Sequence, residues 1–495
     1  MMRTGIYMAW KDRKWIRRAR AYLLAAPALV LFAGCAAVGP DYTAPETAAA
    51  PMWNAGLEEG LSPGRANPEE LAQWWKSFHD PVLAALIERA VQGNLDLKEA
   101  SSRVREARAR RAAAGAGLFP TLDLSGSLQR SRGSGDSGGG STRTLYSAGF
   151  DASWEIDLFG GVRRSIEASE ADLQAVREEL NDTLVSLTAE VALNYFELRT
   201  FQARLDAAEK NLALQQETYL LEESLRKAGL SDELSLQRAL TNLAGTRSRL
   251  PSLRASANEA KNRLAVLLGE QPGAVHGELD EHRPIPVVPL DVSVDAPADV
   301  LRRRPDIRRA ERELAAQSAR VGVAKADLYP RISLGGSIGY SALSSGDLIT
   351  AGSRTFGYGP RITLPVFSAG SIRANIEARS ALQEQALIRY ESSVLTALEE
   401  VENILTAYGQ EQMRLRSLRE AADAAREAAE LAEYQYRSGL IGFTTLLDAQ
   451  RSLLSAQDEL AQSSGTAASN LVRLYKALGG GWQAYETAEK SPGEE

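Results

Sequence analysis

Two stretches of the chain alternate apolar and polar residues with a period of two. The first runs from Leu122 to Leu128 and, after a Gly/Ser-rich gap, from Tyr146 to Leu158. The second runs from Ile332 to Tyr340 and, after another gap, from Phe356 to Val366. Alternation of this length on both sides of a turn-rich gap predicts two β-hairpins, and therefore four strands.

Such strands have two interpretations. They are either half-buried strands of a sandwich, or strands of a transmembrane β-barrel with lipid outside and water inside. About ten alternating residues suit a tilted membrane strand. Four strands cannot close a barrel, and open strand edges are not tolerated in lipid. If the strands cross a membrane, several chains must share one barrel.

A helical pattern follows each pair of strands. Gly161 to Lys227 and Gly370 to Arg437 are rich in Ala, Leu, Glu, Gln and Arg and contain no proline. At ~1.5 Å per residue, a stretch of roughly 65 residues predicts a helix of roughly 100 Å. After a short break, a return helix is predicted to run to Gly269 in the first case and to Gly479 in the second.

The break between each long helix and its return helix carries stop and start signals. Gly229 and Gly439 follow a basic last turn, which is a typical helix stop. In the first break, Ser231 is predicted to cap the return helix, with Asp232 and Glu233 in its first turn. Leucines at seven-residue spacing predict left-handed coiled-coil packing near the break, namely Leu236, Leu243 and Leu250, and Leu446, Leu453 and Leu460.

These patterns are two copies of one unit. Pro330 follows Pro120 by 210 positions, and Gly439 follows Gly229 by the same interval. Self-similarity at one long offset predicts two equivalent structural units in one chain. The helical stretches before the strands, Pro81 to Ala114 and Arg302 to Lys325, are equivalent too. The first is very basic towards its end, and we interpret its arginines as a solvated face: Arg103, Arg105, Arg108, Arg110 and Arg111.

The N-terminus has the layout of a signal peptide, with basic residues before an apolar run from Ala21 to Gly34. The alternative is a retained anchor helix. The string Phe32-Ala33-Gly34-Cys35 resembles a bacterial lipobox and favours cleavage and lipidation at Cys35, the only cysteine. Ala36 after it goes with outer-membrane sorting in such lipoproteins. A single cysteine permits no intramolecular disulfide.

Composition argues against several functions. The net charge of −7 and pI of about 5.5 give no footprint for nucleic acid. His79, His276 and His282 do not have metal-ligand spacing, and no Gly-rich phosphate loop follows a strand. We expect neither catalysis nor a cofactor, apart from an N-acyl diacylglycerol lipid on Cys35.

Several strings together identify the chain as similar to the TolC-like and OprM-like outer-membrane efflux lipoproteins. They are Cys35-Ala36-Ala37-Val38-Gly39-Pro40-Asp41-Tyr42, Trp74-Trp75-Lys76-Ser77-Phe78-His79-Asp80-Pro81, Leu301-Arg302-Arg303-Arg304-Pro305-Asp306-Ile307, Tyr436-Arg437-Ser438-Gly439 and Leu446-Leu447-Asp448-Ala449-Gln450-Arg451.

The resemblance implies a mixed α and β fold and a homotrimer. Three chains with four strands each would form one transmembrane β-barrel in the bacterial outer membrane, in contact with its lipid. A long periplasmic α-helical coiled-coil barrel would continue it. The partners would be a periplasmic adaptor and an inner-membrane pump of the resistance-nodulation-division type. The function would be the exit duct of a tripartite efflux system. The alternatives are a type I protein-secretion channel and a trimeric structural or adhesive surface protein.

The resemblance also implies two sets of site residues. Leu446 and Asp448 match the helix that narrows the periplasmic end, where aspartates form a ring; a second aspartate of some relatives is replaced by Thr445. The alternative for Asp448 is a solvated pair with Arg451. The adaptor-contact positions match Arg437, Gly439 and Leu440, and in the first copy Lys227 and Gly229. There the alternative is a plain helix stop.

The sequence thus divides into six predicted regions. They are a signal peptide (1–34), a lipidated N-terminus with a first helical region (35–119), a first repeat (120–269), a proline-rich connector (270–300), a second repeat with its leading helix (301–479) and a disordered tail (480–495).

Overall fold

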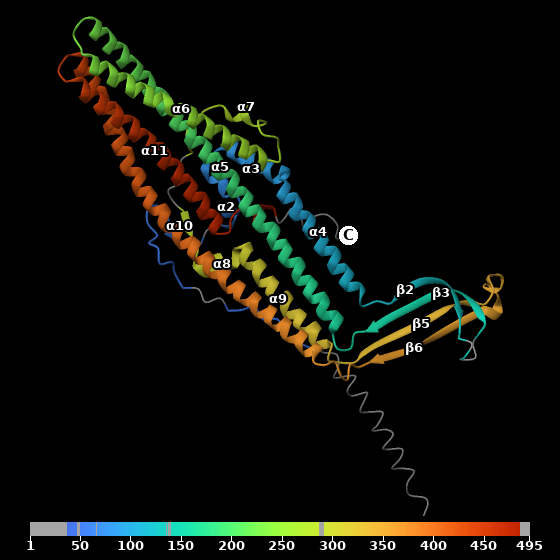
Figure 1. The fold of residues 1–495 in the computed structure, drawn as a ribbon. Helices are drawn as coiled ribbons and strands as arrows, with labels where there is room; N and C mark the ends of the chain where they lie inside the picture. The colour runs from blue at the N-terminus through green and yellow to red at the C-terminus, as the bar shows by residue number, and fades with distance from the viewer. Residues whose placement is uncertain are drawn as a thin grey trace, which may run out of the picture. The chain divides into compact units, whose positions relative to one another are not determined.

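The computed structural model describes residues 37–46, 50–65, 67–134, 136, 140–286 and 292–485 (Figure 1). Cys35 and the predicted signal peptide lie outside the described residues. The chain forms two compact units. The strand unit contains the described residues before 46, with Arg105–Ala175 and Ala310–Arg389; the tip unit contains Glu46–Val104, Val176–Arg309 and residues from Tyr390 onwards.

The strand unit contains the four predicted strands in one antiparallel sheet of order β2-β3-β5-β6 (Figure 1). Their bounds are Thr121–Arg132 for β2, Thr142–Ile156 for β3, Arg331–Ala342 for β5 and Arg354–Thr363 for β6. The alternating pattern had extended the last strand to Val366. The strand ends earlier, before Pro365, a residue that cannot donate a ladder hydrogen bond.

The register sorts the two kinds of side chain onto opposite faces of the sheet. One cross-strand row is Leu124, Phe150, Ile338 and Phe356, and the next is Asp123, Asp151, Ser337 and Gly357. The apolar row is 73, 48, 65 and 79% exposed, so no element of the described chain packs over it. A sandwich within one chain would bury this face.

The helices of the two copies match in length and position. The long helices are α5 (Gly161–Lys227) and α10 (Ser371–Arg437), of 67 residues each. The return helices are α6 (Glu233–Leu267) and α11 (Phe443–Ala477), of 35 residues each. The starts of α10 and α11 follow those of α5 and α6 by 210 positions. Within the described residues, no helix is both long and apolar enough to cross a membrane.

The helical stretch before the first strand differs from the prediction, because it is broken. Helix α3 (Pro81–Gly93) ends at Asn94, and α4 (Leu95–Ala116) begins after it. The Asn94 side-chain oxygen accepts from the Leu97 backbone N–H at 3.0 Å, so Asn94 caps a new helix rather than continuing the old one. In the second copy, α8 (Pro297–Arg303) and α9 (Pro305–Ala326) divide at Arg304, just before Pro305.

The remaining elements are short. The predicted connector contains α7 and β4, and β4 pairs in parallel with β1. Their bounds are Leu61–Pro63 for β1, Pro68–Ala72 for α2, Trp74–Phe78 for the 3-10 helix η1, His276–Leu279 for α7, Val292–Val294 for β4, Ser345–Asp347 for η3 and Ala351–Ser353 for η4.

Ordered structure continues past the predicted start of the disordered tail at residue 480. Trp482 is buried, and the Arg308 guanidinium carbon lies 5.2 Å from the centre of its ring. The ring of Tyr485 stacks on that of Trp75 at 6.5 Å. Aromatic burial therefore holds residues 480–485 in place, a contribution that the polar composition of the tail concealed.

Candidate functional site at the helical tips

Each long helix of the tip unit ends in the same glycine motif. Gly229 and Gly439 both have φ of 72°, as the predicted helix stops require. The Leu230 backbone N–H donates to the Leu225 carbonyl, and that of Leu440 donates to Gln435, each at 2.9 Å. These are Schellman bonds. A Cβ at either glycine would meet no atom within 4 Å, so the backbone angle and not the space requires glycine.

The residue after each glycine is an exposed leucine. Leu230 and Leu440 are 76 and 72% exposed, although this position often packs back on its helix. Each neighbouring cation pairs with a glutamate of its own helix, Lys227 with Glu223 at 3.1 Å and Arg437 with Glu433 at 2.6 Å, and Arg437 also lies 3.8 Å from Glu217 of α5. Each tip therefore presents an apolar side chain next to a basic one.

The residues predicted for the gate lie on two sides of α11. Thr445 and Asp448 are exposed, one turn apart, whereas Leu446 is 1% exposed. The alternative pair with Arg451 is not formed, because Arg451 Nε donates to Asn242 Oδ1 at 3.1 Å. Among the described residues, Asp448 forms no ion pair. Its exposed carboxylate can therefore interact with ions or with another molecule on that surface.

A buried carboxylate joins the two tips. Glu222 on α5 accepts hydrogen bonds from the hydroxyl of Tyr436 on α10 and, at 2.7 Å, from that of Ser231. Burial, and then the bond to Glu222, raises the pKa of Tyr436 far above its ordinary value. Ser231 lies one residue too early to cap α6, which begins at Glu233. Asp232 caps it instead, accepting from the Ser235 backbone N–H at 2.7 Å.

Contacts between α5 and α11 above the tips are also polar. Asn211 donates to Gln457 at 2.7 Å, and Gln450 donates to Thr218 at 2.8 Å. Arg204 pairs with Asp458 at 2.7 Å. The leucine pattern predicted an apolar seam, and Leu446 and Leu453 are indeed buried, but Leu460 is only half-buried. The contacts of Asn211 and Thr218 with α11 form a polar seam between α5 and α11. Their seven-residue spacing was the sequence signal for it.

A second feature lies in the strand unit, where the start of the described chain is clamped. The Val38 backbone N–H donates to the Phe159 carbonyl at 3.0 Å, and the Val38 carbonyl accepts from Arg164 Nε at 3.2 Å. Arg164 also pairs with Asp41 at 2.6 Å. Gly39, with φ of 106°, lies so close to Gly322 that a Cβ would be 2.4 Å from the Gly322 Cα. Sequence reasoning did not predict this clamp.

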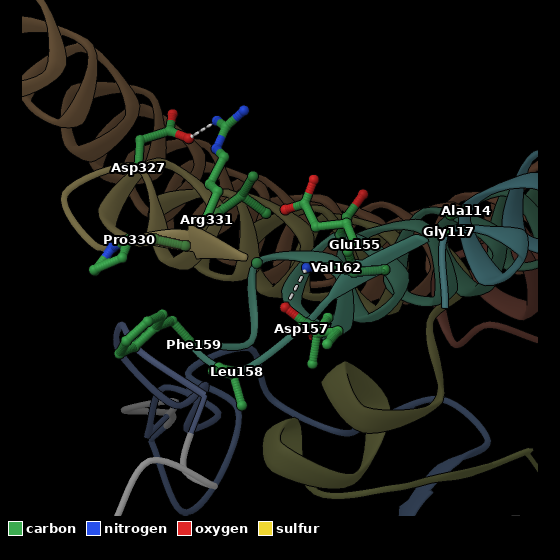
Figure 2. Close-up of a pocket in the computed structure, with 15 residues that line it drawn as sticks. Ala114, Gly117, Glu155, Asp157, Leu158, Phe159, Val162, Asp327, Pro330 and Arg331 are labelled. Carbon is green, nitrogen blue, oxygen red and sulfur yellow. Dashed lines mark hydrogen bonds and ion pairs between the residues drawn. The ribbon is translucent and has the colours of Figure 1, made fainter. Parts of the chain in front are cut away.

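Beside the clamp, a cavity of 320 Å³ lies where the strands meet the helices (Figure 2). Asp157 caps α5 there, accepting from the Val162 and Arg163 backbone N–H groups at 3.1 and 2.9 Å. Asp327 pairs with Arg331 across the strand start, and Glu155 points into the same space (Figure 2). The bonds to Asp157 hold the start of α5 directly after β3, and the Asp327–Arg331 pair holds the start of β5 after α9.

A small antiparallel sheet with a bare apolar face, joined to long paired helices, defines the class of TolC-like outer-membrane channels. Structural comparison agrees. The outer-membrane channel OprN matches with TM-score 0.84 and 40% identity, over 90% of this chain and 99% of that one. The open state of the Neisseria gonorrhoeae MtrE channel matches with TM-score 0.79 and 29% identity, over 90 and 99%.

The chain belongs to the outer membrane efflux protein family, whose sequence model matches residues 86–270 and again 296–480. The solvent efflux pump outer membrane protein SrpC of Pseudomonas putida is 34% identical over 462 residues, 92% of this chain and 97% of that protein. Nodulation protein T of Rhizobium leguminosarum bv. trifolii is 33% identical over 454 residues, 92 and 96% of the two chains.

Membership fixes the general function. The chain is the outer-membrane channel of a tripartite efflux system, the exit duct that works with a periplasmic adaptor and an inner-membrane pump. It resides in the outer membrane and extends into the periplasm. Homotrimers are typical of the family. These findings favour efflux over protein secretion and over an adhesive role.

Proposed function

We propose that three copies of this chain close one twelve-stranded barrel. The observation that carries the proposal is the sheet itself, with a bare apolar face and two outer strands, β2 and β6, that each pair on one side only in the described chain. Successive strands are antiparallel, so β6 of one copy and β2 of the next have opposite directions and can pair. Closure would satisfy both edges, as lipid requires.

The helices would continue this barrel as a periplasmic tunnel, narrowed at its end by a ring of three Asp448 carboxylates. The exposed position of Asp448 on α11 supports this role, with Thr445 a turn before it and Leu446 packed behind. Three carboxylates facing one narrow lumen attract cations and repel one another. Closure then depends on the packing of α11 against its neighbours rather than on the aspartates.

The tips would dock the periplasmic adaptor. Each offers an exposed leucine next to a cation: Leu230 beside Lys227, and Leu440 beside Arg437. Gly229 and Gly439 set the backbone turn that places the leucine outward. A flexible partner helix can bury such an apolar side chain and pair with the cation beside it.

The chain would also be anchored by a diacylglycerol and an N-acyl group on Cys35. Support comes from the clamp on residues 38–41, since it holds the chain beside the end of β3, only a few residues after the cysteine. Mass spectrometry of protein from outer membranes should find a lipidated Cys35 as the first residue. An unmodified Cys35 within a retained N-terminus would contradict this part of the proposal.

The gate is tested by recordings in planar bilayers. Purified trimers should conduct ions with a preference for cations and should be blocked by divalent cations. Asp448→Ala should reduce both properties, whereas Asp458→Ala, which removes a carboxylate paired with Arg204, should leave selectivity unchanged. If Asp448→Ala channels keep the parent's selectivity and divalent block, Asp448 does not line the constriction. If no preparation conducts, the channel proposal itself fails.

A further inference from the structure

Three arginines lie on the apolar face of the sheet, at one end of it. In β2, Arg130 and Arg132 follow Leu128 at intervals of two residues, and in β6 Arg354 precedes Phe356 by two. Because successive side chains of a strand point to opposite faces, these arginines project from the same face as the apolar residues. All three are exposed.

The carboxylates of the sheet lie on its other face. The acidic residues of the four strands are Asp123, Asp151 and Glu155. Asp123 and Asp151 share one polar row, and Asp151 accepts from the Ser125 hydroxyl at 2.7 Å. Among the described residues, none of the three arginines takes part in an ion pair. The apolar face therefore has cations of its own and no carboxylate to neutralise them.

The arginines lie at the end of the sheet away from the helices. β2 ends at Arg132 and β6 begins at Arg354, whereas the helices adjoin the other ends of these strands (Figure 1). Tyr340 lies opposite Arg354, and Tyr146 lies one apolar-face row before Arg130. Tyrosines mark the membrane boundary of such barrels, and arginine on the lipid face is tolerated near that boundary but not at the midplane.

Both strands that carry the arginines are outer strands of the sheet. The proposed closure joins β6 of one copy to β2 of the next, and the two strands are antiparallel. The start of β6 then adjoins the end of β2, which places Arg354 of one copy near Arg130 and Arg132 of its neighbour. Guanidinium groups gathered at this junction repel one another unless an anion lies between them.

We propose that this junction binds phosphate groups of the lipopolysaccharide in the outer leaflet. In the proposed barrel the helices lie in the periplasm, so the arginines reach the headgroups on the outside of the cell. A guanidinium binds phosphate through two parallel hydrogen bonds, which the ammonium of lysine cannot form. Arg130 and Arg132 are about 7 Å apart along the strand, close enough to bind one phosphorylated headgroup together. The apolar face beside them would contact the acyl chains of the same lipid.

This inference rests on the proposed three-copy barrel, and lipid binding by purified trimers tests it. Delipidated trimers in detergent are incubated with lipopolysaccharide, with its dephosphorylated form or with phosphatidylglycerol, and native mass spectrometry counts the lipid that remains bound. The parent should retain lipopolysaccharide in preference to both other lipids. Equal retention of phosphatidylglycerol would mean that the junction accepts any anionic lipid, and the assignment to lipopolysaccharide would be wrong.

Substitution of the arginines locates the site. Arg130→Gln/Arg132→Gln/Arg354→Gln should weaken lipopolysaccharide binding about tenfold, because charge-assisted hydrogen bonds to phosphate are lost. The matched control is Arg143→Gln, which removes an arginine from the same end of the sheet but from its polar face, opposite Ser131. It should bind like the parent. Each single variant of the three should lose about two- to threefold, so the test does not depend on assembly of the triple variant.

The outcomes separate the inference from the proposed function. If the parent has the native mass of a trimer but retains the phosphorylated and dephosphorylated forms equally, the inference is wrong and the trimer stands. Equal loss of binding in Arg143→Gln also overturns it, because the face of the sheet would then not matter. A native mass of one chain would overturn both.

Ionic strength gives a second readout of the same contact. Added salt should release lipopolysaccharide from the parent more steeply than from the triple variant, because salt screens the attraction between guanidinium and phosphate. Retention through the acyl chains alone would give the two proteins the same salt dependence and would contradict the proposal.

Discussion

The sheet and the tips distribute polar and apolar side chains in opposite ways. In the sheet, the large apolar row that includes Phe150 is exposed, and none of the described residues covers it. At the tips, Leu446 is buried, and buried polar residues such as Gln450 hydrogen-bond across the helices. The sheet thus depends on surroundings that the chain alone does not provide. The tips bury apolar residues of their own, and hydrogen bonds between their helices hold them together. A single substitution can remove one of these hydrogen bonds.

The largest expected effect is a charge on the apolar face of the sheet. Phe150→Lys should abolish assembly in the outer membrane, because lysine at the lipid face of a barrel costs roughly 2–4 kcal/mol. Ser337→Lys, one row away on the polar face, is the matched control and should assemble. Trimer yield from outer-membrane fractions measures both. Equal yields would mean that the apolar face does not meet lipid.

Next in size is the loss of the hydrogen bond between the tips. Tyr436→Phe removes one of the two hydroxyls bonded to the buried Glu222 and should cost about 1–3 kcal/mol. The control is Tyr434→Phe, since Tyr434 is exposed. Amide hydrogen exchange should accelerate around Glu222 and Tyr436 in the first variant only. The same exchange rates in both would show that the bond does not stabilise the tips.

A smaller effect is expected at the glycine of the second tip. Gly439→Val forces a β-branched residue to φ of 72° and should destabilise the tip by roughly 1–2 kcal/mol. It should also weaken crosslinking to the adaptor, while membrane trimers remain. Gly409→Val, at a helical glycine with equally open surroundings, should leave both unchanged. Normal adaptor crosslinking in Gly439→Val would leave the glycine as a helix stop only.

The smallest expected effect is a difference between the two return helices in how the stability of their first turns depends on pH. The backbone N–H of Ser235 lowers the pKa of the Asp232 cap below its usual 3.8, so the cap stabilises α6 above that pH and is lost as pH falls through the lowered pKa. At α11 the cap position is Gly442, which has no side chain to titrate. Hydrogen exchange of the two first turns, corrected for intrinsic rates, should diverge only in that acid range. Parallel behaviour would exclude the cap as the cause.

The sequence predicted the regular elements well because each has a strong period. The strands follow a period of two, and the helices of 67 residues have no proline to interrupt them. The helix stops were predictable from glycine, because few other residues adopt the left-handed backbone. Both are local properties, and local sequence is sufficient to specify them.

Competition between neighbours was not predictable. Ser231 and Asp232 are both good caps, and the structure uses Asp232, while the Ser231 hydroxyl donates to Glu222, nine residues before it. The polar seam was missed because Asn211 and Thr218 resemble the solvated positions of any charged helix. Asn94 was missed because asparagine inside a helical pattern is common, and only its bond to Leu97 shows a new helix start.

The contact between Gly39 and Gly322 has a consequence for the order in which the protein is made. The two residues are 283 positions apart, and their backbones touch with no room for a side chain between them. The N-terminal segment leaves the ribosome first, but its binding place is complete only after α9 has been synthesised. The beginning of the chain is made first but cannot form this native contact until residue 322 has been made.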